Sequence, residues 1–251
     1  MVNRAMNESS SHEETRPTPE QRWQAYWGDV ADKPGEALWD TPPTDDTAKL
    51  LSFCEDDIDR ELQLVDVGCG NGPRSHFLAE HFPKVVGVDV SVAAIDAAQQ
   101  LHQAPNLEFR VLDAIEPDQS KTLHDELGDA NVHVSAMFHS MSPAERALAA
   151  ESVATLCGQT GRFFVEELGA EAERVFAELQ ALGGPPPAKF VKLFESGITP
   201  GVMPEGALEA LMASHGFGVV RKGTVPHQLT ETGPDGKAVE IALDCWLFAP
   251  E

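Results

Sequence analysis

Short apolar runs alternate with helix-like amphipathic stretches from Leu62 onward. The runs are rich in β-branched residues and continuously apolar, as in Val85 and Val86, which is typical of strands covered on both faces. This rhythm favours parallel strands with helices packed on both sides of one sheet. The predicted strands are residues 62–67, 85–90, 107–112, 131–137 and 162–166.

Capping signals mark two of the intervening helices. Ser91 precedes an alanine-rich run and predicts a helix over residues 92–101. The segment Ser142-Pro143-Ala144-Glu145 combines a capping box with a proline in the first turn. We expect this second helix to end at Cys157, just before Gly158.

The alternation of strands and helices is interrupted after the fifth predicted strand. Helical patterns over 170–182 and 188–196 flank a Gly/Pro break, and a loop follows to residue 203. This connection is much longer than the usual four to six or so residues, so we interpret about 170–203 as a cap insertion. A helix is then expected from Pro204 to His215.

The end of the chain predicts an antiparallel hairpin. A strand over about 219–229, with a bend at Pro226, is followed by a second strand over 238–248. The connecting Gly233-Pro234-Asp235-Gly236 is a concentrated turn signal.

The residues ahead of the first strand divide into two parts. Residues 1–20 are polar and predict a disordered tail, whereas 21–61 contain three of the four tryptophans and the only tyrosine. We interpret 21–61 as an N-terminal helical cover and 62–251 as the core, together one elaborated domain.

Charge and cysteine content limit the classes of binding partner and the cellular compartment that we expect. The 41 acidic residues outnumber the 18 Lys and Arg residues and give a formal net charge of −23, which disfavours nucleic acid and anionic membrane surfaces. No apolar run is long enough to span a membrane. The four cysteines form no CxxC pair, so we expect a reducing, cytoplasmic compartment and no metal site. Monomer and homodimer both remain open.

A glycine-rich segment, Asp66-Val67-Gly68-Cys69-Gly70-Asn71-Gly72, directly follows the first predicted strand. Its glycines allow a sharp turn and a close approach of a ligand to the backbone. A dinucleotide fingerprint starting at Gly68 requires Gly or Ala at position 73, where Pro73 stands. The segment instead resembles motif I of the class I S-adenosylmethionine-dependent methyltransferases.

The resemblance implies a fold, a cofactor and a set of contacts. The expected fold is a doubly wound, Rossmann-like α/β architecture with a seven-stranded, mostly parallel sheet, a C-terminal antiparallel hairpin and two lid segments, one N-terminal and one after the fifth strand. Asp89 would accept hydrogen bonds from the ribose hydroxyls and Asp113 from the adenine amino group, while Asp66 would chiefly organise the glycine-loop amides. The residues assigned to S-adenosylmethionine are Asp66, Gly68, Cys69, Gly70, Gly72, Asp89, Val90, Asp113, Ala114, Met137, Phe138 and Trp39.

The acceptor side is predicted after the fourth and fifth strands. The segment Ala136–Met141 resembles the family segment that passes beneath the sulfonium, and His139 there is suited to act as a general base toward a hydroxyl. Glu166 or its neighbour Glu167 would orient the acceptor, and we select Glu166. The prediction is O-methylation of a small molecule in an apolar pocket beneath both lids.

Several alternatives stay open. Transfer to nitrogen, sulfur or carbon, and methylation of a peptide or protein, fit the same fold. An NAD(P)-dependent reductase and a non-catalytic S-adenosylmethionine-binding protein are the rivals from other classes.

Overall fold

The computed structural model describes residues 17–42, 46–181, 188–199, 201–232 and 236–251. Most of the predicted tail (1–16), the predicted Gly/Pro break (183–187) and most of the predicted hairpin turn (233–235) therefore lie outside the described residues. In chain order the elements are α1 (Pro19–Val30), α2 (Thr47–Cys54), β1 (Leu64–Val67), α3 (Pro73–Leu78), β2 (Val85–Asp89), α4 (Val92–Leu101), β3 (Leu107–Val111), α5 (Pro117–Leu127), β4 (Asn131–Ser135), the 3-10 turn η1 (Phe138–Ser140), α6 (Pro143–Cys157), β5 (Phe163–Leu168), α7 (Ala170–Ala181), α8 (Ala188–Glu195), α9 (Ala207–Ala213), β6 (Phe217–Thr232) and β7 (Ala238–Pro250).

The strands form one seven-stranded sheet in the order β3-β2-β1-β4-β5-β7-β6. The first five strands pair in parallel, and β7 inserts antiparallel between β5 and β6. The order reverses beside β1, so the loops after β1 and β4 diverge at the carboxyl edge and leave room for a ligand. This architecture confirms the predicted fold class.

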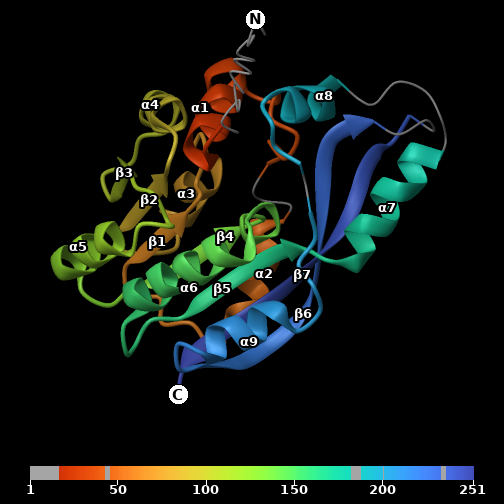
Figure 1. Ribbon diagram of the computed structural model, residues 1–251. Coiled ribbons are helices and arrows are strands. Elements are labelled where there is room, and N and C mark those ends of the chain that lie inside the picture. Colours follow the sequence, from red (N-terminus) through yellow and green to blue (C-terminus); the bar gives the residue numbers. More distant parts are fainter. Residues whose placement is uncertain (1–16, 43–45, 182–187, 200, 233–235) are drawn as a thin grey trace, which may run out of the picture.

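Two apolar layers hold helices against the sheet. Val65, Phe163 and Trp246 belong to a buried cluster that includes residues of α5, α6 and α9. Leu64 and Phe164 belong to a second cluster, which contains residues of α2, α3 and α4. Figure 1 shows α5, α6 and α9 crossing in front of the sheet, with α2 behind it. Continuous apolarity in the strands is thus explained by burial on both faces.

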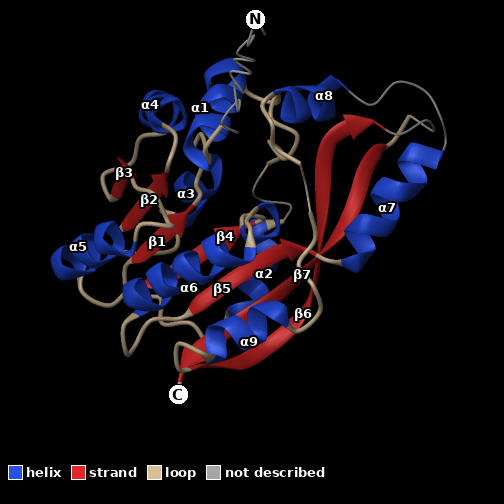
Figure 2. Cartoon of the chain, in the orientation of Figure 1, coloured by secondary structure: helices blue, strands red, loops and turns tan. Residues whose placement is uncertain are grey.

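The hairpin is longer than the parallel strands and curves away from them at one end (Figure 2). Helices α7 and α8 lie beside that end, as does the segment that follows α1. The hairpin has register shifts between Val219 and Arg221 and between Gln228 and Thr232. Pro226, expected at a bend, pairs in register with Ala242; β6 is an edge strand, where proline is tolerated.

Several other boundaries differ from the sequence prediction by a few residues, and three of the differences have a clear physical reason. Strand β4 ends at Ser135, two residues early, because Ala136 adopts a left-handed conformation with φ of 52° and turns the chain away. Strand β5 continues to Leu168 because β7 pairs with it to that residue. Helix α9 begins at Ala207 and not at Pro204, since Gly206 at its N-cap has φ of 72°.

The capping predictions are confirmed. Ser91 accepts from the amide of Ala94 at the start of α4, and Ser142 and Glu145 form a reciprocal capping box on α6. A capping box that the prediction overlooked, between Thr18 and Gln21, starts α1 at Pro19, within the segment assigned to the tail.

Candidate functional site

One cavity extends along the carboxyl edge of the sheet, from the glycine loop after β1 to the curved end of the hairpin. Its lining brings together most of the residues that the sequence assigned to the cofactor. These are Asp66, Gly68, Cys69, Gly70, Asp89, Val90, Asp113, Ala114, Met137 and Trp39. His139, the predicted base, lines the same cavity.

The glycine loop can be built only with glycine. Gly68, Gly70 and Gly72 have φ of 75°, 55° and 89°, a region that other residues rarely occupy. A Cβ on Gly70 would lie 2.5 Å from the Trp27 ring, and one on Gly72 would lie 2.6 Å from Phe109. Gly72 does not line the cavity; it is the N-cap of α3.

Asp89 connects the loops after β1 and β2. Its Oδ2 accepts from the amide of Gly70 at 3.0 Å, and its Oδ1 accepts from the amide of Ser91 at 2.9 Å. Burial raises the pKa of Asp89 to about 6, although the two backbone hydrogen bonds oppose the increase. This carboxylate therefore titrates closer to neutrality than an ordinary aspartate.

Asp66 has a different environment from the one expected. Its Oδ2 accepts from the Ser75 hydroxyl at 2.5 Å, and its Oδ1 lies 2.7 Å from Nδ1 of His133. The carboxylate that contacts a glycine-loop amide is Asp89. Asp66 instead joins β1 to α3 and β4, beneath the loop.

Asp113 is half-buried at the end of β3. Its Oδ1 accepts from the amide of Ile115 at 3.0 Å, and the Gln119 side chain accepts from its amide. These bonds fix the turn in which Asp113 and Ala114 border the cavity.

His139 is held by a buried carboxylate from the neighbouring strand. Glu167 accepts from the amides of Met137 and Phe138 at 2.8 and 2.6 Å, and from that of His139 at 3.2 Å. Its Oε2 also lies 3.0 Å from Nδ1 of His139. Because a carboxylate only accepts, this contact places the proton of the neutral ring on Nδ1 and leaves the lone pair on Nε2.

Besides Gly72, two predicted site residues do not reach the cavity. Phe138 is fully buried and packs against Phe163, with ring centroids 6.3 Å apart. Glu166 is also fully buried; it accepts from the Ser135 hydroxyl at 2.7 Å and lies 3.8 Å from Arg74. The turn after β4 directs Met137 and His139 outward and Phe138 into the core.

A second histidine on the cavity wall was not identified from the sequence. His227, on β6, is 4% exposed, and its Nδ1 lies 2.6 Å from Oδ2 of Asp46. Arg74 donates to the same oxygen at 2.9 Å. His227 is more than 150 positions from both Asp46 and Arg74 in the sequence, and no local pattern links it to them.

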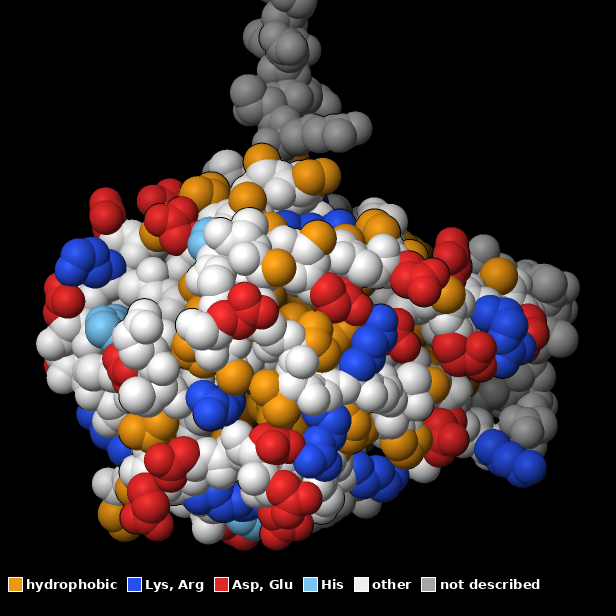
Figure 3. All heavy atoms as spheres, turned by 90° about the horizontal axis from the view of Figure 1, so that it is seen from below, with side chains coloured by type: hydrophobic (Ala, Val, Ile, Leu, Met, Phe, Trp, Pro, Cys, Tyr) orange, Lys and Arg blue, Asp and Glu red, His pale blue; other side chains and the backbone are white. Residues whose placement is uncertain are grey.

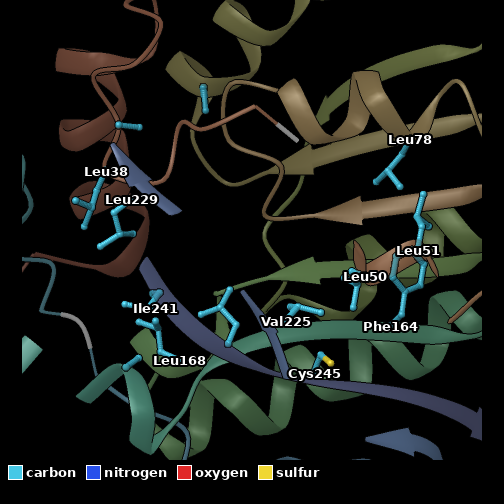
Figure 4. Close-up of a cluster of buried hydrophobic side chains, with 14 of the residues drawn as sticks. Leu38, Leu50, Leu51, Leu78, Phe164, Leu168, Val225, Leu229, Ile241 and Cys245 are labelled. Atoms are coloured by element: carbon cyan, nitrogen blue, oxygen red, sulfur yellow. The ribbon is translucent and has the colours of Figure 1, made fainter. Parts of the chain in front are cut away.

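Most of the rest of the wall is apolar, with Arg22, Glu145 and Thr199 among its polar residues. The N-terminal cover contributes Leu38, Trp23 and Trp39, while the cap and hairpin contribute Phe176, Leu193, Leu229 and Ile241. Figure 4 shows Leu38 beside Leu229 and Leu168 beside Ile241, in the buried cluster that joins these segments.

The N-terminal cover also contains an aromatic cluster. Its rings contact one another at centroid distances of 5.5 to 6.1 Å and belong to Trp23, Tyr26, Trp27 and Trp39. Within the described ranges, no three His, Cys, Asp or Glu side chains are grouped to hold a metal ion.

Comparison with known proteins agrees with this geometry. Residues 64–161 match the family described as "Methyltransferase domain". No curated protein sequence matches the chain.

Three solved structures are informative. A SAM-dependent methyltransferase from Anabaena variabilis superposes with a TM-score of 0.88 at 28% identity, covering 94% of this chain and 96% of that chain. Magnesium protoporphyrin IX methyltransferase from Synechocystis, with bound SAH, has a TM-score of 0.53 at 18% identity, covering 90% and 92%. A structure reported for the conversion of a disulfide bond into a thioacetal group in echinomycin biosynthesis has a TM-score of 0.60 at 17% identity, covering 85% of each chain.

The matched segment spans β1 to the turn before β5 and includes the glycine loop, Asp89 and Asp113. The fold similarity to the Anabaena variabilis enzyme covers 94% of the chain and therefore extends well beyond this segment. The chain is therefore a class I S-adenosylmethionine-dependent methyltransferase.

Proposed function

We propose that this methyltransferase transfers the methyl group to a hydroxyl oxygen of a small, largely apolar acceptor. The observation that carries the proposal is the His139–Glu167 pair at the wall of the apolar cavity. A hydroxyl must lose its proton as it is methylated, and Nε2 of His139 is oriented to accept that proton. Nε2 of His139 has no hydrogen-bond partner among the residues that the structure describes, whereas Nδ1 contacts Glu167.

The cofactor fits the residues present. Gly68 and Gly70 border the cavity without side chains, so a ligand can approach their backbone closely. Asp89 would accept from the ribose hydroxyls, Asp113 would face the adenine, and Met137 would contribute apolar wall. Gly72 and Phe138, behind this surface, would support the loops that hold the cofactor. When bound, S-adenosylmethionine supplies an activated methyl group on a sulfonium centre.

The protein's remaining contributions are alignment and exclusion of water. The aromatic cover and the cap enclose the acceptor side, and Glu167 fixes His139 through four contacts. Glu166, predicted to touch the acceptor, would instead act from within the core through Arg74 and Ser135.

The proposed partners and compartment follow from charge and thiol state. Figure 3 shows Asp and Glu side chains spread among Lys and Arg over one face, without a basic patch on it. This distribution supports a small acceptor over nucleic acid.

All four cysteines are buried and unpaired, which supports a location in the cytoplasm. We propose that the enzyme works there as a monomer or homodimer. Among the described residues, none of the helices has the length and apolarity to span a bilayer.

The proposal is tested by assaying methyl transfer from S-adenosylmethionine to panels of hydroxyl, amine, thiol and carboxylate compounds. We expect products only from the hydroxyl panel, with the methylated atom identified by NMR. Exclusive methylation of another class of atom would contradict O-methylation while leaving the methyltransferase assignment intact.

The base is tested by His139→Ala and Glu167→Gln. Because a general base contributes roughly 10²- to 10⁴-fold, kcat should fall in that range for H139A, with S-adenosylhomocysteine affinity nearly unchanged. Glu167→Gln should also lower kcat, since an amide cannot orient the imidazole and accept from three backbone amides together. Glu166→Gln is the matched control on the same strand, without a contact to His139. Unchanged turnover in H139A would remove His139 from the mechanism.

A further inference from the structure

A second histidine–carboxylate pair faces the cavity from the wall formed by the hairpin. His227 lines the cavity, and its Nδ1 is buried and lies 2.6 Å from Oδ2 of Asp46, an ion-pair contact that lacks hydrogen-bond alignment. Its Nε2 is not fully buried and forms no hydrogen bond within the part of the chain that the structure describes. This nitrogen therefore lies on the side of the ring that borders the cavity.

The contact with Asp46 determines which nitrogen carries the proton. Burial alone would raise the pKa of Asp46, but Arg74 and His227 lower it more, so the net pKa lies well below its usual range. Asp46 is therefore an acceptor only. At 2.6 Å from a carboxylate oxygen, Nδ1 carries the proton of the ring, because a lone pair on this nitrogen would be repelled by the negative charge. Neutral His227 consequently presents a lone pair at Nε2.

The pair is built into the core and does not depend on flexible surface groups. Asp46 is the N-cap of α2 and is 1% exposed. Arg74, on α3, donates to Asp46 and also lies 3.8 Å from Glu166. The position of His227 is thus fixed relative to the edge of β5, from which Glu167 holds His139.

The cavity-lining neighbours of His227 on the hairpin are apolar. Leu229 lies two residues further along β6 and also lines the cavity, as do Ile241 and Leu243 on the paired strand. An acceptor atom that faces Nε2 without donating a hydrogen bond would leave this nitrogen desolvated and unpaired, which weakens binding by roughly 5- to 150-fold. The wall therefore discriminates between acceptors by a single polar contact.

We propose that His227 is a specificity-determining residue that accepts a hydrogen bond from a second donor group of the acceptor. The acceptor is then a molecule with two hydrogen-bond donors on an apolar frame. One is the hydroxyl that faces His139, and the other is a hydroxyl or N–H that faces His227. This inference rests on the proposed O-methylation for the role of the first group.

Binding to the complex with S-adenosylhomocysteine tests the inference without turnover. The probes are naphthalene, 2-naphthol and a series of dihydroxynaphthalenes, with dissociation constants measured by calorimetry. In the wild type, the best dihydroxy isomer should bind at least about tenfold more tightly than 2-naphthol, which corresponds to about 1.4 kcal/mol. His227→Leu should remove this gain and leave 2-naphthol affinity within about threefold.

Two variants distinguish loss of the hydrogen bond to the second donor group from a general disturbance of the cavity wall. His227→Gln, whose amide oxygen can still accept, should restore part of the gain. Leu229→Ala, the matched control on the same strand, should weaken the mono- and dihydroxy probes by similar factors. Absence of any gain from the second hydroxyl in the wild type, or equal losses for both probes in H227L, would overturn the inference.

An NMR measurement on the wild-type protein makes the test independent of whether the variants fold. Long-range ¹H–¹⁵N correlation of the imidazoles should show His227 as the neutral tautomer protonated at Nδ1, with its Nε2 signal shifting when a dihydroxynaphthalene is added. The opposite tautomer would overturn the inference. Neither measurement uses methyl transfer, so a failure of O-methylation would be seen separately in the acceptor assay.

Discussion

At the scale of single residues, the site depends on carboxylates that are buried and have fixed roles. Glu167 organises the turn after β4, Asp66 joins β1 to its neighbours, and Asp89 holds the glycine loop. Each accepts hydrogen bonds from defined donors, so their positions are set before a ligand binds. Such preorganisation lowers the cost of ordering the site during binding.

The raised pKa of Asp89 predicts a pH dependence of cofactor binding. The folded-state pKa of about 6 lies above the ordinary value of 3.8, so the carboxylate is ionised above pH 6 and becomes protonated as the pH falls through 6. Because the ionised form is the better acceptor for ribose hydroxyls, S-adenosylhomocysteine affinity should be constant above about pH 7. Below pH 6 it should fall by up to about tenfold per pH unit.

Calorimetry between pH 5 and pH 8 measures this dependence. In the control Asp89→Asn, binding should be weaker and nearly independent of pH over the same range. A wild-type affinity that stays flat down to pH 5 would mean that Asp89 does not titrate in this range or does not contact the cofactor.

At the scale of elements, the cover and the cap are joined by lysines on α8. Nζ of Lys189 donates to the carbonyl of Gly35 at 2.6 Å and to that of Thr230 at 3.4 Å. Nζ of Lys192 lies 2.7 Å from Glu36, with both side chains more than a third exposed. These contacts connect α8 to the segment after α1 and to the hairpin. Leu38, Leu193 and Leu229 of the same three segments line the cavity.

The two lysines should contribute unequally. Lys189→Met removes charge-assisted hydrogen bonds to partly buried carbonyls, so the local opening free energy of α8 should fall by about 1.5–3 kcal/mol. Lys192→Met removes an exposed ion pair, which solvent screens, and should have a clearly smaller effect. Hydrogen exchange of the α8 amides measures both values. Equal effects would show that the loss of charge, and not the carbonyl contacts, controls opening.

At the scale of the whole molecule, the cavity is bordered by segments from both ends of the chain. Trp23 and Trp39 come from the cover, Phe176 and Leu193 from the cap, and Leu229 from the hairpin. A ligand that contacts all three segments binds the folded state only, and it should therefore stabilise the molecule against unfolding.

Ligand-induced stabilisation distinguishes the cofactors. At a concentration of 100 Kd, S-adenosylhomocysteine should add about 2.7 kcal/mol to the unfolding free energy. For a chain of this length that corresponds to an increase in Tm of roughly 5–11 °C. Differential scanning calorimetry measures the shift, and NADPH serves as the control, with no shift expected. A shift with NADPH and none with S-adenosylhomocysteine would contradict the methyltransferase assignment.

Much of the fold and of the cofactor region could be predicted from the sequence, because their signals are local. The glycine loop, the strand-end Asp89 and Asp113, and the capping box of α6 are each determined by neighbouring residues. Parallel strands then bring their carboxyl ends to one edge, so local motifs sufficed to assemble most of the cavity lining.

The errors occurred where a tertiary contact outweighed the local pattern. The run Asn131–Met137 is apolar enough for a longer strand, but Ala136 turns the chain so that three amides meet Glu167. Phe138 was expected at the cavity because its segment resembles the family segment beneath the sulfonium, but the same turn places its ring in the core. Neither outcome is visible in the spacing of the residues.

The sequence alone determined the parallel core and the glycine loop, because hydrophobic period and turn chemistry act over a few residues. The class of cofactor followed from the resemblance of that loop to a known family motif. Only the tertiary structure selected Glu167 over Glu166 as the partner of His139, and only it brought Asp46, Arg74 and His227 together. Partner choice among buried charges depends on which side chains share a space after folding. It is fixed by the desolvation cost that each unpaired group would incur, and not by its position along the chain.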